Sequence, residues 1–278
     1  MELTPGQKQR LNELDIFAEH EQAGEREFPS AEERDEYFRQ VEKKLVELNR
    51  ERLRDLTGEK FLPELRRLEA DLRDVLLELG FTEVTTPIRL ARGHLEKMGI
   101  DEDHPLWQQV YWLEGGDYCL RPMHAPHLYS VLGRFDKTLE QPISIFEVGT
   151  CFRKETGGRR HLAEFNMLNL VELGPVKEPE ERLQDIIAAV MEGLELDYEL
   201  LEEDSHVYGQ TFDVEIKGME IASGAVGPHE LDEPWDISDS WAGLGLGLER
   251  LIMAREGMKN ITRVGRSLIY QDGGRLNV

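Results

Sequence analysis

Two arginines, each close to a glutamate along the chain, are the residues best suited to chemistry in this sequence. Arg153 stands two residues before Glu155 in the segment 145–173, and Arg250 directly follows Glu249 in the stretch GLGLER. A guanidinium offers a fork of donors that matches phosphate oxygens, and a glutamate can accept hydrogen bonds from an amino group such as that of adenine. The two pairs therefore favour a site that grips a triphosphate and the base attached to it.

Each pair also has an ordinary structural explanation. Arg153 and Glu155 alternate along a predicted strand, so both point to one face of a sheet, as a surface ion pair would also do. The glycines of GLGLER let the backbone approach a nucleotide where a strand turns into a helix, yet they also suit close packing of strand and helix. Neither pair is specific without the elements around it.

The N-terminal part of the chain reads as helical. Helix-start patterns at Thr4 and Ser30 predict that residues 4–57 form helices, with a break between Gly24 and Pro29. A third helix over 63–79 is predicted from an apolar stripe at three- and four-residue spacing, made of Leu65, Leu68, Leu72, Leu76 and Leu79. A strand over 81–86 follows and is closed by Pro87.

The remainder reads mainly as strands. Gly115 and Gly116 separate the apolar runs 110–113 and 118–121, which predicts a β-hairpin. Further strands are expected at 143–153, 163–173, 211–216 and 219–226, with helices at 178–193 and from Leu248 onward. Many consecutive strands with helices at the ends predict an α+β fold, a mostly antiparallel sheet flanked by helices. We expect an N-terminal helical region over 1–60 and a larger domain over 61–278.

Composition narrows the class of protein. The 278 residues include 33 basic and 56 acidic ones, a net charge of -23, so any RNA contact must rest on a local cluster of basic side chains. Lysine is scarce, with 10 Lys against 23 Arg, which leads us to the hypothesis of a saline cytoplasm; an ordinary acidic protein is the alternative. We expect a cytoplasmic protein, because no apolar run reaches the roughly 18 residues that span a bilayer and no signal peptide is evident. Cys119 and Cys151 lack zinc-site spacing and are expected to be buried free thiols.

Three segments together resemble a known family. The helix, strand and Pro87, then FRKE at 152–155, then GLGLER, follow the order of motifs 1, 2 and 3 of the class II aminoacyl-tRNA synthetases. Within that class the chain is similar to the pyrrolysyl-tRNA synthetases in the stretches LRPMHAPHLY (120–129), HLAEFNMLNL (161–170), VYGQTFDV (207–214), SGAVGPH (223–229) and SWAGLGLGLERL (240–251). The similarity is close over 64–278 and is to the short members, which have no separate N-terminal tRNA-binding domain.

The resemblance implies a function and its cofactors. It implies a class II catalytic core that uses ATP and Mg²⁺ to activate pyrrolysine, or a close N-acyl lysine, and transfers it to an amber-decoding tRNA. The residues it implies for ATP are Arg153, Glu155, His161, Leu162, Phe165, Glu220, Ser223 and Arg250. Arg153 would hold the α-phosphate, Glu155 the adenine amino group, and Phe165 the purine ring. Glu220 and Ser223 would hold Mg²⁺, which prefers hard oxygen ligands and bridges phosphates.

A second set of residues is implied for the amino acid. Its members are Ala125, Leu128, Tyr129, Leu132, Met167, Asn169, Val171, Tyr208, Ala225 and Trp241. Most are apolar, which fits a long uncharged lysine derivative, although core packing is their plain alternative. Asn169 is the exception, and its amide would find a partner in the side-chain carbonyl of an acylated lysine. Tyr208 would sit on a strand-loop that closes over substrate.

The chain departs from the family pattern at three positions next to these residues. His124 stands where leucine is usual, His127 where asparagine is usual, and Asn166 where threonine is usual. Two histidines three apart suggest a metal, but a third ligand is missing from the pattern. The departures leave the amino acid itself open, so a ligase for another amino acid, or a paralogue that binds without aminoacylation, stays an alternative.

Contacts with tRNA and with a second subunit are expected elsewhere. Lys43, Arg50 and Arg54 share one face of the second helix and could follow phosphates, with Arg66 and Arg67 as weaker candidates. The alternative for this face is a solvated surface on which Glu47 and Glu51 pair with the basic residues. A homodimer is expected through the helix over 63–79, since motif 1 forms the dimer interface of class II enzymes.

Overall fold

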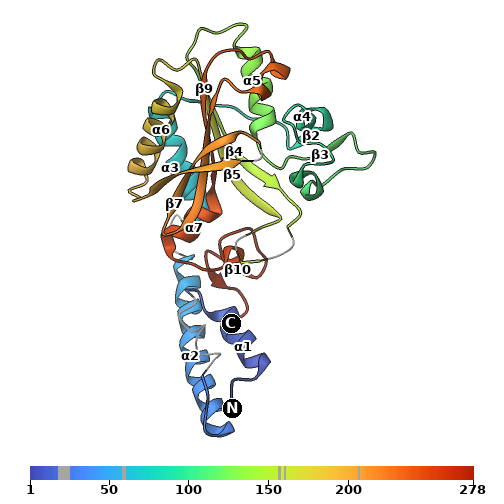
Figure 1. Ribbon diagram of the computed structural model, residues 1–278. Helices are drawn as coiled ribbons and strands as arrows, with labels where there is room; N and C mark the ends of the chain where they lie inside the picture. The colour runs from blue at the N-terminus through green and yellow to red at the C-terminus, as the bar shows by residue number, and fades with distance from the viewer. Residues whose placement is uncertain (18–25, 58–60, 156–157, 160, 206) are drawn as a thin grey trace.

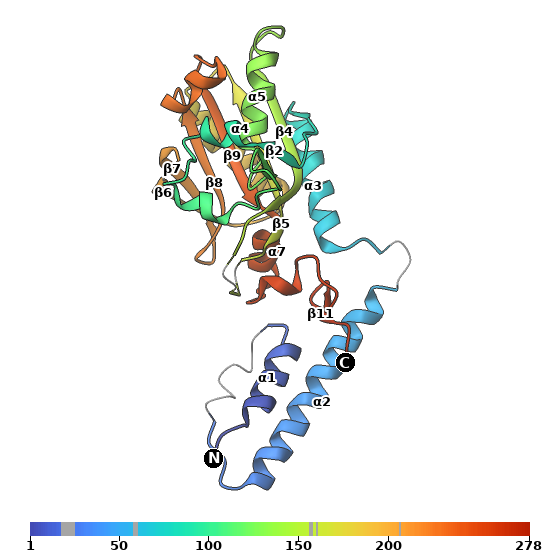
Figure 2. The same ribbon diagram turned by 90° about the vertical axis from the view of Figure 1, so that its right-hand side faces the viewer.

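The structure is a computed structural model that describes residues 1–17, 26–57, 61–155, 158–159, 161–205 and 207–278. It consists of a body of sheet and helices and an arm of two helices that extends from one end of the body (Figures 1 and 2). Within the described residues, no helix is both long enough and apolar enough to cross a membrane. The predicted break at Gly24 and the predicted domain boundary at residue 60 lie outside the described residues.

The described residues of the body form a seven-stranded sheet with the order β1-β4-β5-β9-β8-β7-β6. Its strands are β1 (Thr82–Glu83), β4 (Ile143–Phe152), β5 (Glu164–Leu173), β6 (Glu199–Ser205), β7 (Gly209–Ile216), β8 (Met219–Gly227) and β9 (Trp241–Gly247). All neighbours are antiparallel except β1 and β4, which run parallel. The predicted α+β fold with a mostly antiparallel sheet is confirmed.

Three helices cover one face of this sheet, namely α3 (Glu64–Glu78), α6 (Pro179–Gly193) and α7 (Leu248–Glu256). The predicted leucine stripe of α3 is confirmed, because Leu65, Leu68, Leu72 and Leu76 are buried in the core beneath the sheet. On α6, the apolar residues Leu183, Ile186, Ile187 and Val190 enter the same core. This face of the sheet is therefore occupied by packing (Figure 1).

The opposite face is covered less completely. Helix α5 (Ala125–Phe135) packs on β4 and β5, and α4 (Arg92–Glu96) lies beside it with the small sheet of β2 (Arg89–Ala91) and β3 (Tyr118–Leu120). The short helices are η2 (Pro105–Gln109), η3 (Glu230–Trp235) and η4 (Ile261–Arg263). A second apolar cluster fills the space under α5 and includes Leu128, Tyr129, Leu132 and Trp241.

The arm consists of α1 (Pro5–Leu14) and α2 (Ala31–Asp55). Both predicted caps are present, since Thr4 accepts a hydrogen bond from Gln7 N–H and Ser30 accepts one from Glu33 N–H. The arm is joined to the C-terminal hairpin of β10 (Tyr270–Gln271) and β11 (Gly274–Arg275). There the N–H of Arg275 donates to Asn49 over 2.8 Å, which ties the end of the chain to α2.

Two predicted strands are wrong in extent. The strand expected over 81–86 is ordered as β1 for only two residues, because the Thr86 N–H and hydroxyl turn to the Glu147 carboxylate and Pro87 has no N–H to donate. The run 110–113 forms one bridge, Trp112 to Cys119, flanked by backbone hydrogen bonds from Leu113 N–H to Tyr118 and from Leu120 N–H to Tyr111. The predicted hairpin is therefore present but short, and β3 also pairs with β2. The turn itself is confirmed, with positive φ at Gly115 and Gly116.

Candidate active site

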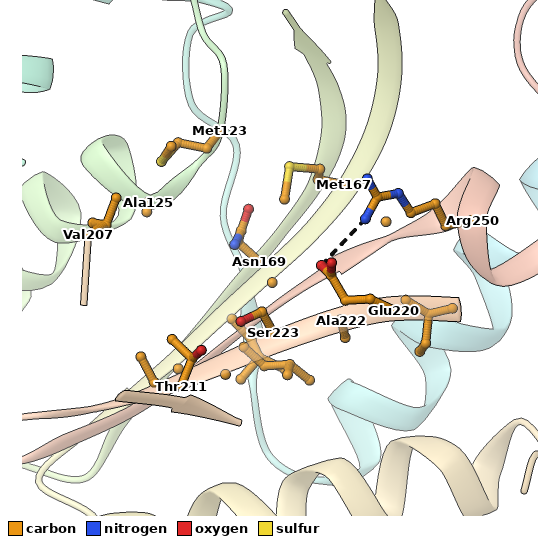
Figure 3. A pocket seen from close by; sticks show the side chains of 18 of the residues that line it. Met123, Ala125, Met167, Asn169, Val207, Thr211, Glu220, Ala222, Ser223 and Arg250 are labelled. Carbon is orange, nitrogen blue, oxygen red and sulfur yellow. Dashed lines mark ion pairs between the residues drawn. The ribbon is translucent and has the colours of Figure 1, made fainter. Parts of the chain in front are cut away.

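One cavity of about 390 Å³ lies on the less covered face of the sheet. Every residue that the resemblance assigns to ATP, to the metal or to the amino acid lines this cavity. Residues from α5, β5, β8, β9 and the start of α7 thus meet at one place, although they come from segments far apart in the sequence (Figure 3). The cavity adds lining residues that sequence reasoning missed, among them Met123, Val207, Thr211 and Gly243.

The base of the cavity is built by alternation on two neighbouring strands. On β5 the side chains of Met167, Asn169 and Val171 face the cavity, and they pair in register with Gly247, Gly245 and Gly243 on β9. Large side chains on one strand are thus accommodated by glycines on the next. A Cβ added to Gly245 would lie only 2.7 Å from Asn169 Nδ2. The Gly-Leu alternation from Gly243 to Gly247 is a sequence pattern that could have revealed this surface.

Arg153 lies at the polar end of the cavity. Strand β4 ends at Phe152, so Arg153 and Glu155 follow the strand and do not alternate along it, which corrects the predicted boundary. Arg153 is nevertheless held in place, because its backbone N–H donates to the Ala163 carbonyl and its side-chain Nε donates to the Pro122 carbonyl over 3.0 Å. Burial lowers the pKa of the Arg153 guanidinium from its very high ordinary value, and a desolvated cation of this kind gains most from an arriving phosphate.

The arginine is also placed against an aromatic ring. Its guanidinium carbon lies 5.4 Å from the centroid of Phe165 on β5, within the range of a cation–π contact. His161 Nδ1 lies 3.9 Å from a carboxylate oxygen of Glu155, and His161 is about half exposed. Arg153, Glu155, Phe165 and His161 therefore border one polar region that has space for a base and its phosphates.

Arg250 approaches the same region from the first turn of α7. Its Nη1 lies 3.4 Å from Glu220 on β8, as Figure 3 shows. The neighbouring Glu249 is buried, with 2% exposure, and its carboxylate accepts bonds from the backbone N–H and the side-chain amide of Asn166. Burial raises the pKa of Glu249 to about 7. Glu249 thus fixes the start of α7 against β5 and so positions Arg250.

Glu220 and Ser223 can face one cavity only because β8 is irregular. Residues three apart on a regular strand point to opposite faces. Here Val214 pairs with Ala222 and Glu215 with Glu220, so the ladder passes over Ile221 and the side-chain alternation shifts by one residue. Ser223 donates to Asp213 over 2.6 Å. One carboxylate and one hydroxyl fit a Mg²⁺ that arrives on phosphates and keeps its waters, rather than an all-protein metal cage.

The other end of the cavity is apolar. Ala125, Leu128, Tyr129 and Leu132 on α5 and Ala225 and Trp241 on the sheet line it. Trp241 is fixed by its indole N–H, which donates to Asp232 over 2.8 Å. Tyr208 precedes β7 and meets the Trp241 ring edge-on at 5.9 Å. Its closure over substrate stays a prediction.

The two histidines that depart from the family pattern, His124 and His127, are buried next to the apolar end of the cavity. His124 is fully buried, and its Nδ1 lies 3.1 Å from Oδ1 of Asn169. His127 has 8% exposure, and its Nδ1 lies 3.3 Å from the Thr86 hydroxyl. Burial lowers the pKa of each to about 4, so both are neutral at pH 7. Among the described residues no group of three or more His, Cys, Asp or Glu could hold a metal.

The remaining predicted positions lie away from the cavity. Lys43, Arg50 and Arg54 are exposed on α2 in the arm. Glu47 lies 3.8 Å from Arg50 and 2.9 Å from Arg54. These two arginines are therefore paired with a surface glutamate, as the alternative of a solvated face expects. Cys119 and Cys151 are buried free thiols, as expected.

Comparison with known proteins places this arrangement in a family. The family model described as tRNA synthetases class II core domain (F) matches residues 55–272. The alpha subunit of phenylalanine–tRNA ligase from Methanothermobacter thermautotrophicus is 24% identical over 253 residues, which covers 73% of this chain and 48% of that subunit. The chain therefore spans about half the length of this curated relative. Threonine–tRNA ligase from Thiobacillus denitrificans is 29% identical over 97 residues, or 34% of this chain and 15% of the relative.

Solved structures are more similar. The crystal structure of pyrrolysyl-tRNA synthetase from Desulfitobacterium hafniense superposes with a TM-score of 0.90 at 47% identity, covering 99% of this chain and 98% of that one. A second structure of a pyrrolysyl-tRNA synthetase from the same organism gives a TM-score of 0.88 at 45% identity over 99% and 98% of the two chains. The chain therefore belongs to the class II aminoacyl-tRNA synthetases and, within them, to the family of pyrrolysyl-tRNA synthetases.

Proposed function

We propose that this protein activates pyrrolysine, or a closely related N-acyl lysine, with ATP and transfers it to an amber-decoding tRNA. The observation that carries the proposal is a single cavity with two arginines at its polar end and an amide, Asn169, among apolar side chains at the other. Such a cavity can hold a nucleotide and a long uncharged amino acid end to end. The membership of the family supports the same reaction.

In the first step the substrate carboxylate attacks the α-phosphorus in line, and pyrophosphate leaves. Arg153 would bind the α-phosphate and Arg250 the outer phosphates, with Phe165 stacked on the purine and Glu155 at its amino group. Glu220 and Ser223 would hold a Mg²⁺ ion that arrives with ATP, and this ion would further neutralise the phosphate charge. The contribution of the chain is positioning and electrostatic stabilisation, because transfer of this type requires little covalent chemistry from protein.

The apolar end would select the amino acid. Tyr129, Leu132 and Trp241 offer burial for an uncharged ring, and Asn169 offers a hydrogen bond to a side-chain carbonyl. Unmodified lysine would be rejected, because its ammonium would lose its water without gaining a counter-charge there. In the second step the terminal hydroxyl of the tRNA attacks the adenylate and releases AMP.

The tRNA would contact the arm. We propose that region 1–60 is the tRNA-contacting part, that Lys43, Arg50 and Arg54 follow its phosphates, and that 61–278 is the catalytic domain. We also propose a homodimer that works in the cytoplasm. The apolar stripe of α3 is used in the protomer's own core, and Leu77 is the large apolar side chain on the exposed face of this helix, with 53% exposure. A partner would therefore meet a mainly charged surface on α3.

An ATP–pyrophosphate exchange screen tests the substrate. The amino acids compared are N-acyl lysines, free lysine and phenylalanine, each at the same concentration. The proposal expects exchange with N-acyl lysines and none above background with lysine. Exchange with phenylalanine alone would make the protein a ligase for another amino acid. No exchange with any of them, from protein that binds ATP, would make it a binding paralogue.

A further inference from the structure

A buried histidine stands directly behind the amide that the proposed function gives to substrate selection. His124 precedes α5, has no exposed surface, and points its Nδ1 at Oδ1 of Asn169 over 3.1 Å. A side-chain amide oxygen can only accept a hydrogen bond. The Nδ1 must therefore carry the proton, and His124 is the donor.

The other ring nitrogen is consistent with this tautomer. His124 Nε2 borders Gly149, where an added Cβ would approach it to 3.2 Å and would collide with the Arg121 guanidinium. Arg121 is fixed there by the Glu147 carboxylate over 2.6 Å, with both side chains 3% exposed. An unprotonated Nε2 beside a cation is favourable, whereas an N–H would be opposed. Burial also holds the pKa of His124 near 4, so the ring stays neutral and keeps one proton.

The bond from His124 fixes the direction of the amide. With Oδ1 engaged, Nδ2 of Asn169 points the other way, as its oxygen and nitrogen show in Figure 3. Nδ2 lies over Gly245 on the base of the cavity, 2.7 Å from the place that a Cβ on that residue would take. If an apolar side chain replaced His124, the amide could turn over and offer its oxygen to the cavity instead.

We propose that His124 is a positioning residue for substrate selection: by donating from Nδ1 to Asn169 Oδ1, it makes Asn169 a pure donor toward the cavity, so that the pocket selects a side chain with a carbonyl acceptor. This inference rests on the proposed function and deepens it. It also gives one of the three departures from the family pattern a chemical role.

The test compares two amino acids in ATP–pyrophosphate exchange with the full chain. One is Nε-tert-butoxycarbonyl-lysine, and the other is a 2-amino acid whose uncharged all-carbon side chain has the same length but no carbonyl. The readout is the ratio of kcat/KM for the two on one protein preparation, which does not depend on the fraction of active enzyme. His124→Leu should lower this ratio about tenfold, through a higher KM for the carbonyl substrate, because it removes the hydrogen bond that orients the Asn169 amide.

Two further variants separate positioning from packing. His124→Asn places an amide N–H near the position of Nδ1 and should restore the ratio to within about twofold of the wild type. His127→Asn changes the other buried histidine of this segment, which faces Thr86 and not Asn169, and should leave the ratio unchanged. An unchanged ratio in His124→Leu, or an equal loss in His124→Leu and His124→Asn, overturns the inference.

The wild-type protein supplies an independent measurement. A ¹⁵N spectrum of labelled histidine at pH 7, assigned by the resonances that disappear in His124→Asn, should show the Nδ1–H tautomer for His124. The Nε2–H tautomer would overturn the inference even if His124→Leu fails to fold. Wild-type protein that exchanges with neither amino acid overturns the proposed function and this inference with it, whereas wild-type exchange with an unaltered ratio in His124→Leu overturns the inference alone.

Discussion

At the scale of single residues, the two arginines of the cavity differ in their surroundings. Arg153 donates to the neutral Pro122 carbonyl, and burial lowers the pKa of its guanidinium, whereas Arg250 lies 3.4 Å from the Glu220 carboxylate. A desolvated cation that donates to a neutral carbonyl gains more from an arriving phosphate than a cation that already lies beside a carboxylate. Arg153 is therefore expected to be the more important of the two for the reaction.

Arg153→Ala should reduce ATP–pyrophosphate exchange by at least about 100-fold, because it removes a fixed charge from the position proposed for the α-phosphate. Lys154→Ala is the matched control, since Lys154 is adjacent in sequence, exposed, and directed toward the Tyr111 ring. Initial exchange rates at saturating ATP measure both variants. Full activity in Arg153→Ala would remove this residue from the mechanism.

Glu249 should make stability depend on pH. Its folded pKa of about 7 lies above the ordinary value of 4.5, so the folded protein binds the proton more tightly than the unfolded chain does. The free energy of unfolding should therefore fall as pH rises from about 4.5 to 7 and change no further through this group above that. The full effect is on the order of 3 kcal/mol, since a tenfold change in proton affinity is about 1.4 kcal/mol.

Glu249→Gln should remove this component, so the variant should gain stability relative to the wild type between pH 5 and pH 8. Urea unfolding of both proteins at the two pH values measures the difference. Glu164→Gln is the control, because Glu164 lies on the same strand as Asn166 but is 43% exposed and paired with Arg266. Identical pH dependence in Glu249→Gln and the wild type would contradict the assignment.

At the scale of elements, the site depends on one packed face and one irregular strand. Helices α3, α6 and α7 hold the sheet from below, so the strands can present short or absent side chains to the cavity above without losing their support. The register shift in β8 then brings Glu220 and Ser223 to the same side. Both features set where the polar groups of the cavity lie.

The contribution of α3 can be measured with two leucines of one helix. Leu72 is fully buried and Leu77 is 53% exposed. Leu72→Ala should lower the free energy of unfolding by about 2–5 kcal/mol through lost burial and a cavity, whereas Leu77→Ala should stay within about 0.5 kcal/mol. Chemical denaturation at low protein concentration gives both values. Similar losses in the two variants would mean that α3 does not pack as described.

At the scale of the whole molecule, the arm is attached through buried polar contacts. Arg263 is 1% exposed and donates to the carbonyls of Glu13 at 2.7 Å and Gly273 at 2.8 Å, which joins α1 to the C-terminal segment. Figure 2 shows α2 passing beside the C-terminus at the base of the body. Basic side chains on α2 thus have a defined place relative to the cavity.

Replacing Lys43, Arg50 and Arg54 together by glutamine should raise the KM for tRNA and leave ATP–pyrophosphate exchange unchanged. The dependence of tRNA binding on log salt should lose up to about 0.9 in slope for each phosphate contact removed, and less where Glu47 already neutralises the charge. Lys177→Gln, an exposed lysine outside the arm, is the control. An unchanged salt slope in the triple variant would place the tRNA elsewhere.

The net charge of -23 leads to a separate prediction. Added KCl should raise the melting temperature, because the Debye length falls from about 10 Å at 0.1 M to about 3 Å at 1 M and screens repulsion among the carboxylates. Thermal unfolding followed by circular dichroism in 0.1 to 2 M KCl measures this. A melting temperature that stays constant or falls would favour an ordinary acidic protein over the saline hypothesis.

Much of this protein could be predicted from local sequence. The leucine stripe of α3, the caps at Thr4 and Ser30 and the run of strands depend on spacing along the chain, which is a property of neighbours. The motif resemblance placed the candidate residues, and the tertiary structure gathers them around one cavity. Where the sequence misled, at 81–86, the distant Glu147 carboxylate took the hydrogen bonds of Thr86 that a longer strand would have used.

Other features depend on contacts between segments that only folding brings together. The sequence shows that His124 is unusual, but the direction in which its ring points, and thus the orientation of the Asn169 amide, follows from the packing of α5 against β5. The alignment of Glu220 with Ser223 follows from a shift in strand register that no spacing rule reveals. The raised pKa of Glu249 follows from burial against β5. Sequence determined which side chains were available. Tertiary structure decided the direction in which they point and how far they are shielded from water, because orientation and desolvation arise from neighbours in space.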